Sequence, residues 1–402
     1  MMRWITAGES HGEALVGIIE SVPAGLAITS ADIEGALARR RTGYGRGARQ
    51  KFEQDRVRLL SGVRHGRTLG SPIAIEVANS EWPKWRTVMS SDPVDPKDLM
   101  IDAGTGDERE VARNKRLTQP RPGHADLPGM LKYAHEDARN VLERSSARET
   151  AMRVALGEVA RQFLRQVAGI EVLGHVVQVG QEAAPARQLT LGDADAVNAS
   201  DVRCVDAATA ARFRAEIDGA KRSGDTVGGV VEVVAFNVPA GLGTYTQWDQ
   251  RLDGQLAQAL MSIQAAKSVE IGDGLTQTQT RGSRAHDEIL VDARAYRPTN
   301  HAGGLEGGMS NGEPLVARVG FKPISTVPHA LRTIDLENRT AAKALHQRSD
   351  TCAVVPAAVI AEAMVALVLA NAVTQMFGGT TVDRARTAMD SYVRETRARL
   401  QP

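Results

Sequence analysis

The sequence predicts a soluble protein of mixed α and β structure, with one large core or two to three ordinary ones, from three observations. Short β-branched runs bounded by glycine, such as residues 4–7 and 15–19, are typical of strands. Residues 150–168 carry apolar side chains at helical spacing and are followed by Gly169. Residues 352–372 are nearly all apolar, which is typical of a helix buried on every side.

The expected elements alternate along the chain. A helix begins at Thr29 or Ser30, because a hydroxyl can cap its first turn, and ends at the arginines 39–41. Strand signals follow within 57–78, and a turn with aromatic anchors lies at 82–85. Further along, a surface segment is expected at about 90–116 and a partly helical exposed segment at 181–224. Helices are expected at about 126–141 and 249–266, and strands at 171–179 and 227–238. A buried helix is expected at 353–370, ending near 378–379, before a polar tail at about 383–402 that is helical or frayed.

The apolar stretch at 352–372 has the length of a membrane span. Glu362 lies in its middle, where a charge costs about 2.5–3.5 kcal/mol on insertion scales, and Pro356 lies near its start. A core helix is therefore favoured over a membrane span. No signal peptide is recognisable, and a cytoplasmic protein without membrane contact is expected.

Composition narrows the function classes. Charged residues make up 24% of the chain, the net charge is +1, and aromatic residues make up 4%. A disordered chain or a nucleic-acid binder is therefore disfavoured. Cys204 and Cys352 form neither a disulfide framework nor a metal-ligand spacing, which fits a reducing cytosol and predicts no metal site.

The first candidate site is the Gly-Glu-Ser-His-Gly run at residues 8–12. Ser10 and His11 lie in a glycine-flanked break between two strand signals, where the backbone can approach a ligand closely. Histidine exchanges protons near neutral pH. The alternative is an ordinary turn that happens to contain a histidine.

A basic segment follows the first helix. Residues 39–51 hold six cations, three glycines and no acid, which predicts a mobile loop. Such a loop suits bidentate capture of phosphate or carboxylate. A solvated basic loop and a nucleic-acid contact are the two alternatives, and the neutral total charge lowers the second.

Two further motifs place reactive or charged side chains at the start of a predicted helix. In the run 119–126, prolines stiffen the backbone around His124, with Arg121 three residues upstream; a plain turn into a helix is the alternative. The run 143–150 offers Arg144, Ser145, Ser146 and Arg148 at a helix N-terminus, which favours an anion site over a simple N-cap.

Three weaker signals lie in the second half of the chain. The glycine-rich run 300–309 lets backbone lie against a flat ligand or a phosphate, but it matches neither a dinucleotide fingerprint nor a P-loop. Residues 321–326 combine the cation Lys322 with the hydroxyls of Ser325 and Thr326. Arg348, Ser349 and Asp350 precede the buried helix.

Together these motifs resemble the chorismate synthase family, of the actinobacterial type. Three signature stretches occur in the family's order: 8–12, 143–150 and 348–350. The Arg-Pro-Gly-His-Ala-Asp run at 121–126 and the Val-Glu-Ile-Gly-Asp-Gly run at 269–274 also match. The resemblance implies an α+β fold, a single β-α-β-α sandwich domain over 1–402 with antiparallel sheets around a helical core, and a homotetramer.

The resemblance also implies a reaction and its residues. The family is a carbon-oxygen lyase that converts 5-enolpyruvylshikimate 3-phosphate to chorismate by 1,4-anti elimination of phosphate, the last step of the shikimate pathway, and needs reduced FMN. His11 and His124 would act as acids, Asp350 as the base, with Ser10 and Ser146 as relays. The implied substrate or NADP contacts are Arg40, Arg46, Arg49, Arg121, Arg148 and Arg348, with substrate favoured. The implied FMN contacts are Arg144, Ser145, Ser146, Gln264, Ala265, Gly307, Lys322, Pro323, Ile324, Ser325, Thr326 and Arg348.

Three positions depart from the family pattern: Ser21 and Ser268 stand where glycine is usual, and Thr351 follows Asp350 where Val or Pro is commoner. The other hypotheses are a flavin or NADPH oxidoreductase acting on a different phosphorylated carboxylic acid, and a non-catalytic anion or RNA binder. Two acids and a base together favour the lyase over a binder. No motif separates an enzyme that reduces its own flavin with NADPH from one that uses an external flavin reductase.

Overall fold

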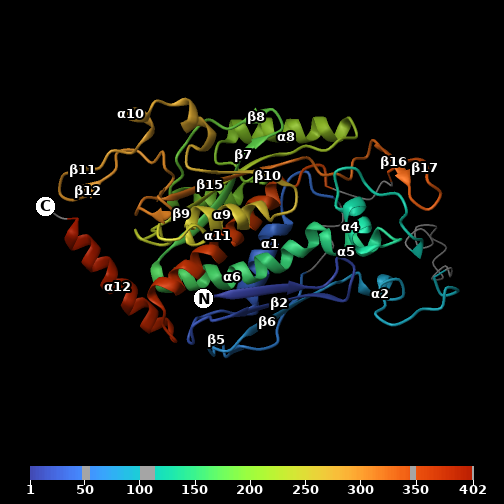
Figure 1. Ribbon diagram of the computed structural model, residues 1–402, viewed down its shortest axis with the longest axis horizontal. Coiled ribbons are helices and arrows are strands. Elements are labelled where there is room, and N and C mark those ends of the chain that lie inside the picture. The colour runs from blue at the N-terminus through green and yellow to red at the C-terminus, as the bar shows by residue number, and fades with distance from the viewer. Residues whose placement is uncertain (48–54, 100–113, 345–349, 401–402) are drawn as a thin grey trace.

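The computed structural model describes residues 1–47, 55–99, 114–344 and 350–400. Two antiparallel sheets enclose a layer of helices (Figure 1). The four-stranded sheet has the order β1 (Arg3–Ala7), β2 (Ala14–Glu20), β6 (Ile73–Ala78) and β3 (Val57–Leu59). The five-stranded sheet has the order β10 (Ala266–Ile271), β15 (Leu315–Phe321), β9 (Gly229–Phe236), β7 (Glu171–Val179) and β8 (Glu182–Ala183). This arrangement confirms the predicted α+β class with antiparallel sheets packed on helices.

The two long central helices join the sheets. Helix α6 (Thr150–Ala168) packs under β2 and β6, and α11 (Val354–Phe377) packs against α6 on one side and against β7 and β9 on the other. Gly157 allows the close crossing, because a Cβ there would lie 2.4 Å from Ala363 Cβ. The main apolar cluster contains residues from Met2 to Ala385. One continuous core is what a single domain over 1–402 would have, and the single domain stays a prediction.

The remaining elements surround this core. The other helices are α1 (Ser30–Arg41), α2 (Trp82–Trp85), α4 (Asp126–Tyr133), α5 (Arg139–Ser145), α7 (Ala194–Ala199), α8 (Ala207–Arg222), α9 (Leu252–Met261), α10 (Gly282–Ala285) and α12 (Val382–Arg399). Short 3-10 turns are η2 (Ala147–Glu149), η3 (Leu191–Asp193), η4 (Trp248–Gln250) and η5 (Gly274–Gln279). The short hairpins pair β4 (Val63–Arg64) with β5 (Arg67–Thr68), β11 (Leu290–Val291) with β12 (Ala295–Tyr296), β13 (Leu305–Glu306) with β14 (Met309–Ser310), and β16 (Arg332–Asp335) with β17 (Thr340–Lys343).

Helix α11 is long and apolar enough to cross a membrane, but 89% of its most apolar window is buried inside the protein. It is therefore a core helix, as predicted. Its one acid, Glu362, is 1% exposed and accepts the Gly174 N–H at 2.8 Å and an Arg203 N–H at 2.8 Å. Arg39 also binds it, and Arg161 lies 3.9 Å away. Burial would raise the pKa of Glu362, but the surrounding guanidinium groups outweigh burial and lower it.

Helix α1 begins as predicted, with the Thr29 hydroxyl accepting the Asp32 N–H in a capping box. The helix ends at the arginines 39–41, as predicted, so these three residues of the basic segment form the last turn of α1 and not a loop. Arg40 is only 6% exposed there. Arg39 pairs with Glu362 and Arg41 with Asp55. Arg40 donates to the Thr150 hydroxyl and the Ala147 carbonyl, and sequence spacing does not show any of these partners. Residues 48–54 of the basic segment lie outside the described residues.

Two predicted helices have different bounds, and two other predicted segments are helical. The helix expected at 126–141 is broken at Ala134, whose φ of 53° ends α4 before α5 begins. The helix expected at 249–266 is the shorter α9, because the chain must leave it at Ser262 to enter β10. The aromatic turn at 82–85 is the one-turn helix α2, and the tail past 383 is helical in α12. The described part of the surface segment, 90–99 and 114–116, is mostly exposed.

Ser21 is a left-handed residue, with φ of 65°, at an exposed position after β2. A residue with a side chain is destabilised by about 1–2 kcal/mol in the left-handed region, whereas glycine adopts this conformation without strain. We expect Ser21→Gly to raise the free energy of unfolding by about 0.5–1 kcal/mol, since glycine loses part of this gain to unfolded-state entropy. Urea unfolding measures it, and Ser21→Ala, which keeps the strain, should change little. A destabilised Ser21→Gly variant would contradict the argument.

Candidate active site

His11 lies in the break between β1 and β2 and is held by a buried carboxylate. Its Nδ1 lies 2.8 Å from Glu143 Oε1, and its backbone N–H donates to Glu143 Oε2 at 2.7 Å. The Ser10 N–H donates to the Glu143 carbonyl at 2.8 Å. The Trp85 ring stacks on the imidazole with centroids 3.8 Å apart. Because a carboxylate only accepts, Nδ1 carries a proton and the ring orientation is fixed.

Gly8 makes this break possible. Its φ is 102°, and a Cβ there would lie 2.5 Å from the Ala14 carbonyl oxygen. Only glycine fits this close approach of the two strands. The glycine-flanked histidine is therefore set by backbone geometry, as predicted for the first motif.

His124 is held in the same way at the start of α4. Its Nδ1 lies 2.5 Å from Asp126 Oδ1. Arg121 donates from Nε to Asp126 Oδ2 at 2.8 Å, and its Nη2 lies 3.2 Å from His124 Nε2. Arg121 also donates to the Thr326 hydroxyl at 3.2 Å. An anion bound at Arg121 would therefore meet the imidazole of His124.

Asp126 is 2% exposed. Burial raises its pKa, but hydrogen bonds from His124 and Arg121 outweigh burial and hold the pKa well below its usual range. A lowered folded-state pKa means that the stabilisation is present above the unfolded value of about 3.9 and is lost as the pH falls through the folded value.

We therefore expect the free energy of unfolding to fall as the pH drops below about 4, and to fall less steeply in Asp126→Asn. Urea unfolding at a series of pH values measures both slopes. Parallel profiles for the two proteins would contradict the role given to Asp126. Asp383→Asn in the first turn of α12 is the control and should leave the slope unchanged, because that carboxylate is 90% exposed and its pair with Arg386 lies at the surface.

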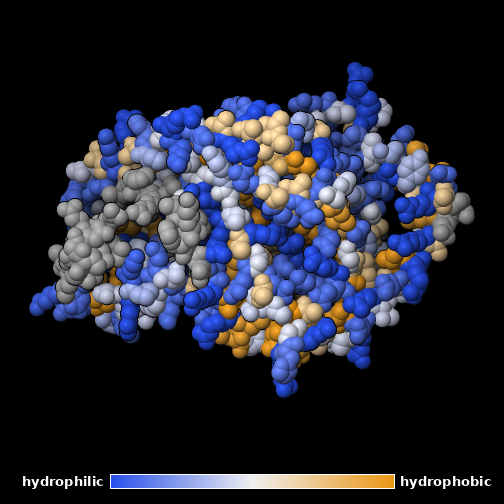
Figure 2. All heavy atoms as spheres, turned by 180° about the vertical axis from the view of Figure 1, so that it is seen from behind, coloured by the Kyte–Doolittle hydropathy of each residue, from blue (hydrophilic) through white to orange (hydrophobic). Residues whose placement is uncertain are grey.

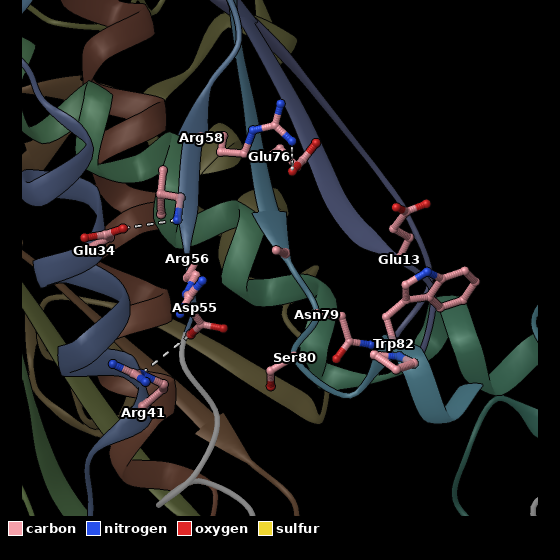
Figure 3. Close-up of a pocket in the computed structure, with 13 residues that line it drawn as sticks. Glu13, Glu34, Arg41, Asp55, Arg56, Arg58, Glu76, Asn79, Ser80 and Trp82 are labelled. Carbon is pink, nitrogen blue, oxygen red and sulfur yellow. Dashed lines mark hydrogen bonds and ion pairs between the residues drawn. The ribbon is translucent and has the colours of Figure 1, made fainter. Parts of the chain in front are cut away.

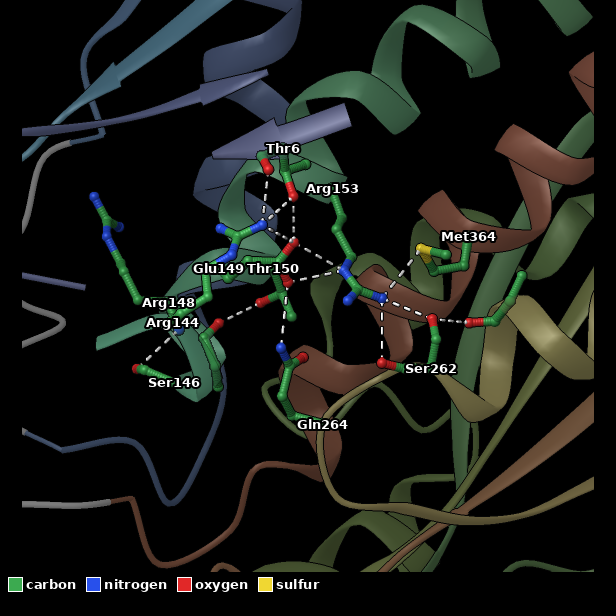
Figure 4. Close-up of polar contacts among 12 residues, drawn as sticks. Thr6, Arg144, Ser146, Arg148, Glu149, Thr150, Arg153, Ser262, Gln264 and Met364 are labelled. Carbon is green, nitrogen blue, oxygen red and sulfur yellow. Dashed lines mark hydrogen bonds and ion pairs between the residues drawn. The ribbon is translucent and has the colours of Figure 1, made fainter. Parts of the chain in front are cut away.

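Residues 143–150 form the junction between α5, η2 and α6 (Figure 4). Arg144 donates to the Thr6 carbonyl at 2.8 Å and to the Gly8 carbonyl at 3.2 Å, which ties this junction to β1. The Ser146 hydroxyl caps η2 by accepting the Arg148 N–H at 3.3 Å, and the Ser145 hydroxyl donates to the Val141 carbonyl at 2.8 Å. The simple N-cap is thus present for Ser146, with two arginines beside it.

Two buried arginines meet at this junction, Arg40 from α1 and Arg148 from η2 itself. Arg40 donates from Nε to the Thr150 hydroxyl at 3.0 Å and from Nη2 to the Ala147 carbonyl at 2.9 Å. Arg148 is 8% exposed and donates to Asp55 Oδ1 at 2.5 Å. Charge is therefore concentrated at the helix start, as the motif predicted.

The loop ahead of β10 and the segment after β15 lie side by side. Gln264 donates to Glu149 Oε2 at 3.2 Å, and the Ala265 carbonyl accepts the Lys322 N–H at 3.0 Å. The Lys322 ammonium also binds the Gly123 carbonyl, next to His124. Ala265 has a φ of 69°, which is strained for a residue with a Cβ.

Asp350 is bound by the basic segment 39–51. Arg46 pairs with it, and the Gly47 N–H donates to its Oδ1 at 2.7 Å. The Val227 N–H donates to the Thr351 carbonyl at 3.0 Å, and the Thr226 hydroxyl donates to the Ile324 carbonyl at 2.8 Å. The segments 226–227 and 322–326 therefore connect Asp350 with the Lys322 loop.

Comparison with known proteins identifies the family. A family model described as "Chorismate synthase" matches residues 2–374. Chorismate synthase of Beutenbergia cavernae is 59% identical over 397 residues, which is 98% of each chain. The chain belongs to the chorismate synthase family. The chorismate synthase of Mycobacterium avium is 57% identical over 404 residues, covering 100% of this chain and 98% of that one. A crystal structure of chorismate synthase matches with a TM-score of 0.77 at 36% identity, covering 99% of this chain and 98% of the other.

The predicted activity is thereby confirmed. As a chorismate synthase, the chain is a phosphate-eliminating lyase that converts 5-enolpyruvylshikimate 3-phosphate to chorismate in aromatic amino acid biosynthesis and depends on reduced FMN. The relatives of the chain among Beutenbergia, Mycobacterium and Nocardia agree with the predicted actinobacterial type.

Among the described residues, most positions with a predicted role in chorismate synthase chemistry are linked by contacts. Glu143 joins His11 to the junction 143–150, Glu149 joins the junction to Gln264, and Lys322 joins Ala265 to the His124 loop. Gly307 is different: it turns the β13–β14 hairpin, whose described contacts run to Gly243 and Leu252. Arg49 and Arg348 lie outside the described residues.

Sequence reasoning missed the acids that hold the predicted residues. Glu143 and Asp126 each bind a histidine, and Glu149 binds Gln264. All three lie inside the quoted motifs, but a search for a carboxylate close in sequence to each histidine could have found only Asp126, two residues after His124, because Glu143 lies 132 positions from His11. Trp85 gave no signal, because its stacking on His11 depends on a loop fold.

The residues present fit a bound flavin. Gln264 Oε1 is buried and has no hydrogen-bond partner among the described residues, so it is an acceptor in need of a donor. Flavins offer such N–H and O–H donors, and the cations and hydroxyls of the Lys322 loop and the 143–150 junction suit the phosphate end.

A separate hollow of about 1130 Å³ opens beside Asp55, with Arg41, Arg56, Trp82 and Asn79 in its wall (Figure 3). None of the predicted site residues lines it. It touches the site indirectly, because Asp55 binds Arg148 and Asn79 donates to the Gly12 carbonyl at 2.9 Å.

Proposed function

We propose that His11 and His124 are the two acids of the elimination and that Asp350 is its base. The observation that carries this assignment is the pairing of each histidine Nδ1 with a buried carboxylate, Glu143 for His11 and Asp126 for His124. Such a carboxylate fixes the tautomer and turns the far ring nitrogen toward a ligand. This pairing is the usual way to orient an imidazole for proton transfer.

His124 is the residue that gives a proton to the leaving phosphate in this proposal. Arg121 lies within 3.2 Å of its Nε2, so a phosphate bound by the guanidinium would lie against the imidazole. Protonation of a departing phosphate oxygen neutralises charge as the carbon-oxygen bond breaks. His11 would hold its proton toward the flavin, with Ser10 and Ser146 as orienting hydroxyls.

Asp350 would take up a proton at the other end of the site. Its partners, Arg46 and the Gly47 N–H, hold the carboxylate in one orientation. Arg46 therefore positions the base in this proposal, in addition to its predicted place among the substrate cations. Arg40, Arg49, Arg121, Arg148 and Arg348 would complete that set, and we favour substrate over NADP as the ligand of Arg40 and Arg46.

The flavin would be held by the residues that the family resemblance indicates. When bound, reduced FMN supplies the electron density that departure of phosphate requires. The proposed contacts are Arg144, Ser145, Ser146, Gln264, Ala265, Gly307, Lys322, Pro323, Ile324, Ser325, Thr326 and Arg348. The unpartnered Gln264 Oε1 and the strained Ala265 backbone support this position, because both are features of ligand sites.

The first experiment is anaerobic. The purified protein is mixed with 5-enolpyruvylshikimate 3-phosphate and chemically reduced FMN, and chorismate and phosphate are followed together. Equal release of both, and none with oxidised FMN, is expected. Absence of chorismate from folded protein with reduced FMN would contradict the assignment of this substrate.

A second arm replaces the chemical reductant by oxidised FMN and NADPH. Turnover in this arm would mean that the protein reduces its own flavin. Turnover that appears only after a separate flavin reductase is added would mean that an external enzyme supplies the reduced cofactor. The outcome also decides whether NADPH is a ligand of this chain.

We also propose a homotetramer in which the outer face of the four-stranded sheet is buried. Ile5, Ile18 and Ala74 form one row across β1, β2 and β6 of that face, and Leu60, the residue after β3, extends it. Ile5 is 65% exposed, Ile18 40% and Leu60 48%. Figure 2 shows apolar side chains along the lower edge of the molecule, where Figure 1 places this sheet.

The charges beside the apolar row favour a second copy as its partner. Arg3 pairs with Glu20 on one side of the row, and Arg58 pairs with Glu76 on the other. A face whose charges are already paired does not repel an identical face, so it can bury itself isologously. An acidic or basic partner would find no net charge to bind.

We expect Ile18→Glu to convert the tetramer into smaller species, because it would place an unpaired charge in the interface. Sedimentation velocity measures the mass, and circular dichroism checks the fold. Leu275→Glu on η5, which is 65% exposed and lies outside this sheet, is the matched control. A tetramer that survives Ile18→Glu would overturn this interface.

A cytoplasmic location completes the proposal. Cys204 and Cys352 are both buried and unbonded, which suits a reducing compartment. Burial raises the pKa of the Cys352 thiol to about 11, so this cysteine is inert at neutral pH. Cell fractionation with antibody detection would test the location.

A further inference from the structure

Glu149 lies at the centre of a buried polar network below β1 (Figure 4). Its Oε1 accepts the Thr6 hydroxyl at 2.8 Å, and its Oε2 accepts Arg153 Nε at 2.8 Å. Gln264 donates its Nε2 to the same Oε2 at 3.2 Å. The residue is 5% exposed, so these bonds are sheltered from water.

The network itself is held at both ends. Arg153 donates from Nη1 to the Ser262 hydroxyl at 2.8 Å and to the Ser262 carbonyl at 3.3 Å. Arg144 lies 3.9 Å from Glu149 Oε1, so two guanidinium groups compensate the carboxylate. The carboxylate therefore occupies one position and cannot turn away from Gln264.

A carboxylate in this position decides which end of the Gln264 amide faces which way. Glu149 can only accept, so the amide nitrogen must face it and the amide oxygen must point to the opposite side. A flipped amide would place its oxygen against Glu149 and lose this bond. The oxygen that points away is the buried Oε1 that has no partner among the described residues.

We propose that Glu149 is a positioning residue that makes Gln264 present an acceptor, and never a donor, to the bound flavin. The proposal rests on the flavin site proposed above. It goes further by assigning a role to a residue that does not touch the cofactor itself. It also states the chemistry of the contact, which is an N–H or O–H of the flavin donating to Gln264 Oε1.

The test exchanges the two functional groups and measures FMN affinity by flavin fluorescence, without turnover. In Glu149→Gln, residue 149 can donate to Gln264 Oε1, so the amide can turn and present its NH2 group. We expect the dissociation constant of FMN to rise about 10-fold, the value of one buried hydrogen bond. Glu158→Gln is the matched control, because Glu158 is another buried acid, lies on the neighbouring α6 and pairs with Arg161, and it should leave affinity unchanged.

The double exchange separates positioning from mere stability. In Glu149→Gln with Gln264→Glu, residue 264 has only acceptor oxygens, and the amide at 149 can donate to one of them. We expect FMN affinity to return to within about 3-fold of the unsubstituted chain, although Gln264→Glu alone places two carboxylates together and weakens binding. A double variant as weak as Glu149→Gln, with an unchanged thermal midpoint, would overturn the positioning role.

Arg144→Met distinguishes failure of this inference from failure of the proposed flavin site. Weaker binding in Arg144→Met together with unchanged binding in Glu149→Gln would leave the site intact and sink the role of Glu149. Unchanged binding in both variants would count against the flavin site as a whole.

Discussion

Replacing His124 by alanine is expected to lower kcat by about 100- to 10,000-fold, which is the usual contribution of a positioned proton donor. The Asp126–Arg121 pair remains in this variant, with Arg121 Nε 2.8 Å from Asp126 Oδ2, so the loop should keep its shape. FMN affinity should change little, since among the described residues His124 forms its side-chain hydrogen bonds with Arg121 and Asp126 and with none of the proposed flavin contacts. Stopped-flow turnover under anaerobic conditions and flavin fluorescence measure the two quantities.

His135→Ala is the matched control for this loss. His135 follows the end of α4, and its Nδ1 lies 3.5 Å from the side-chain nitrogen of Asn140, away from the residues of the proposed mechanism. Its variant should retain full turnover. Full turnover in His124→Ala would remove His124 from the mechanism, and equal losses in both variants would point to a general effect on the fold.

Replacing Glu362 by alanine is expected to cost about 3–5 kcal/mol of folding free energy, the value for breaking a buried ion pair on one side. Arg203 is 5% exposed and donates to Glu362 at 2.8 Å, and Arg39 shares the carboxylate. Burial already lowers the pKa of Arg203 to about 10, which shows how much this guanidinium depends on its partner. Removal of the acid leaves buried positive charge without compensation, and such a loss is a large share of the stability of a typical domain.

Urea unfolding measures this cost, with two comparison variants. Glu362→Gln keeps the acceptor for the Gly174 N–H and should lose less, which keeps the test readable when the alanine variant does not fold. Glu171→Ala removes a half-exposed pair with Arg165 and should cost at most about 1 kcal/mol. Equal effects at Glu362 and Glu171 would contradict the buried-cluster argument.

The sequence alone located much of the fold because local signals were strong. Thr29 and Asp32 fixed the start of α1, and Gly169 marked the end of α6. The nearly unbroken apolar sequence of α11 predicted that this helix is buried on all sides. The break at Ala134 escaped because the residues around it retain helix-forming character and only tertiary packing places alanine in a left-handed conformation.

The departures from the family pattern show the same division. Ser21 has a positive φ, so a serine in place of the family's glycine strains the backbone at this position. Ser268 is in β10, next to an irregularity in the pairing with β15. Its φ is not positive, so serine in place of glycine does not strain the backbone there. The sequence named both positions, and only the backbone angles separated them.

The sequence by itself determined the reaction class, because five short motifs in the family's order carry the histidines, arginines and hydroxyls of the chemistry. Only the tertiary structure decided which charges face each other. Arg39, at the predicted end of α1, binds Glu362 on a helix 323 positions away, and Arg46 binds Asp350 across 304 positions. Glu143 and Glu149 likewise meet His11 and Gln264 only after folding, whereas Asp126 lies two residues from His124. The physical reason is that a motif specifies side chains and local turns, whereas partners far apart in sequence meet only through the packing of the sheets on α6 and α11.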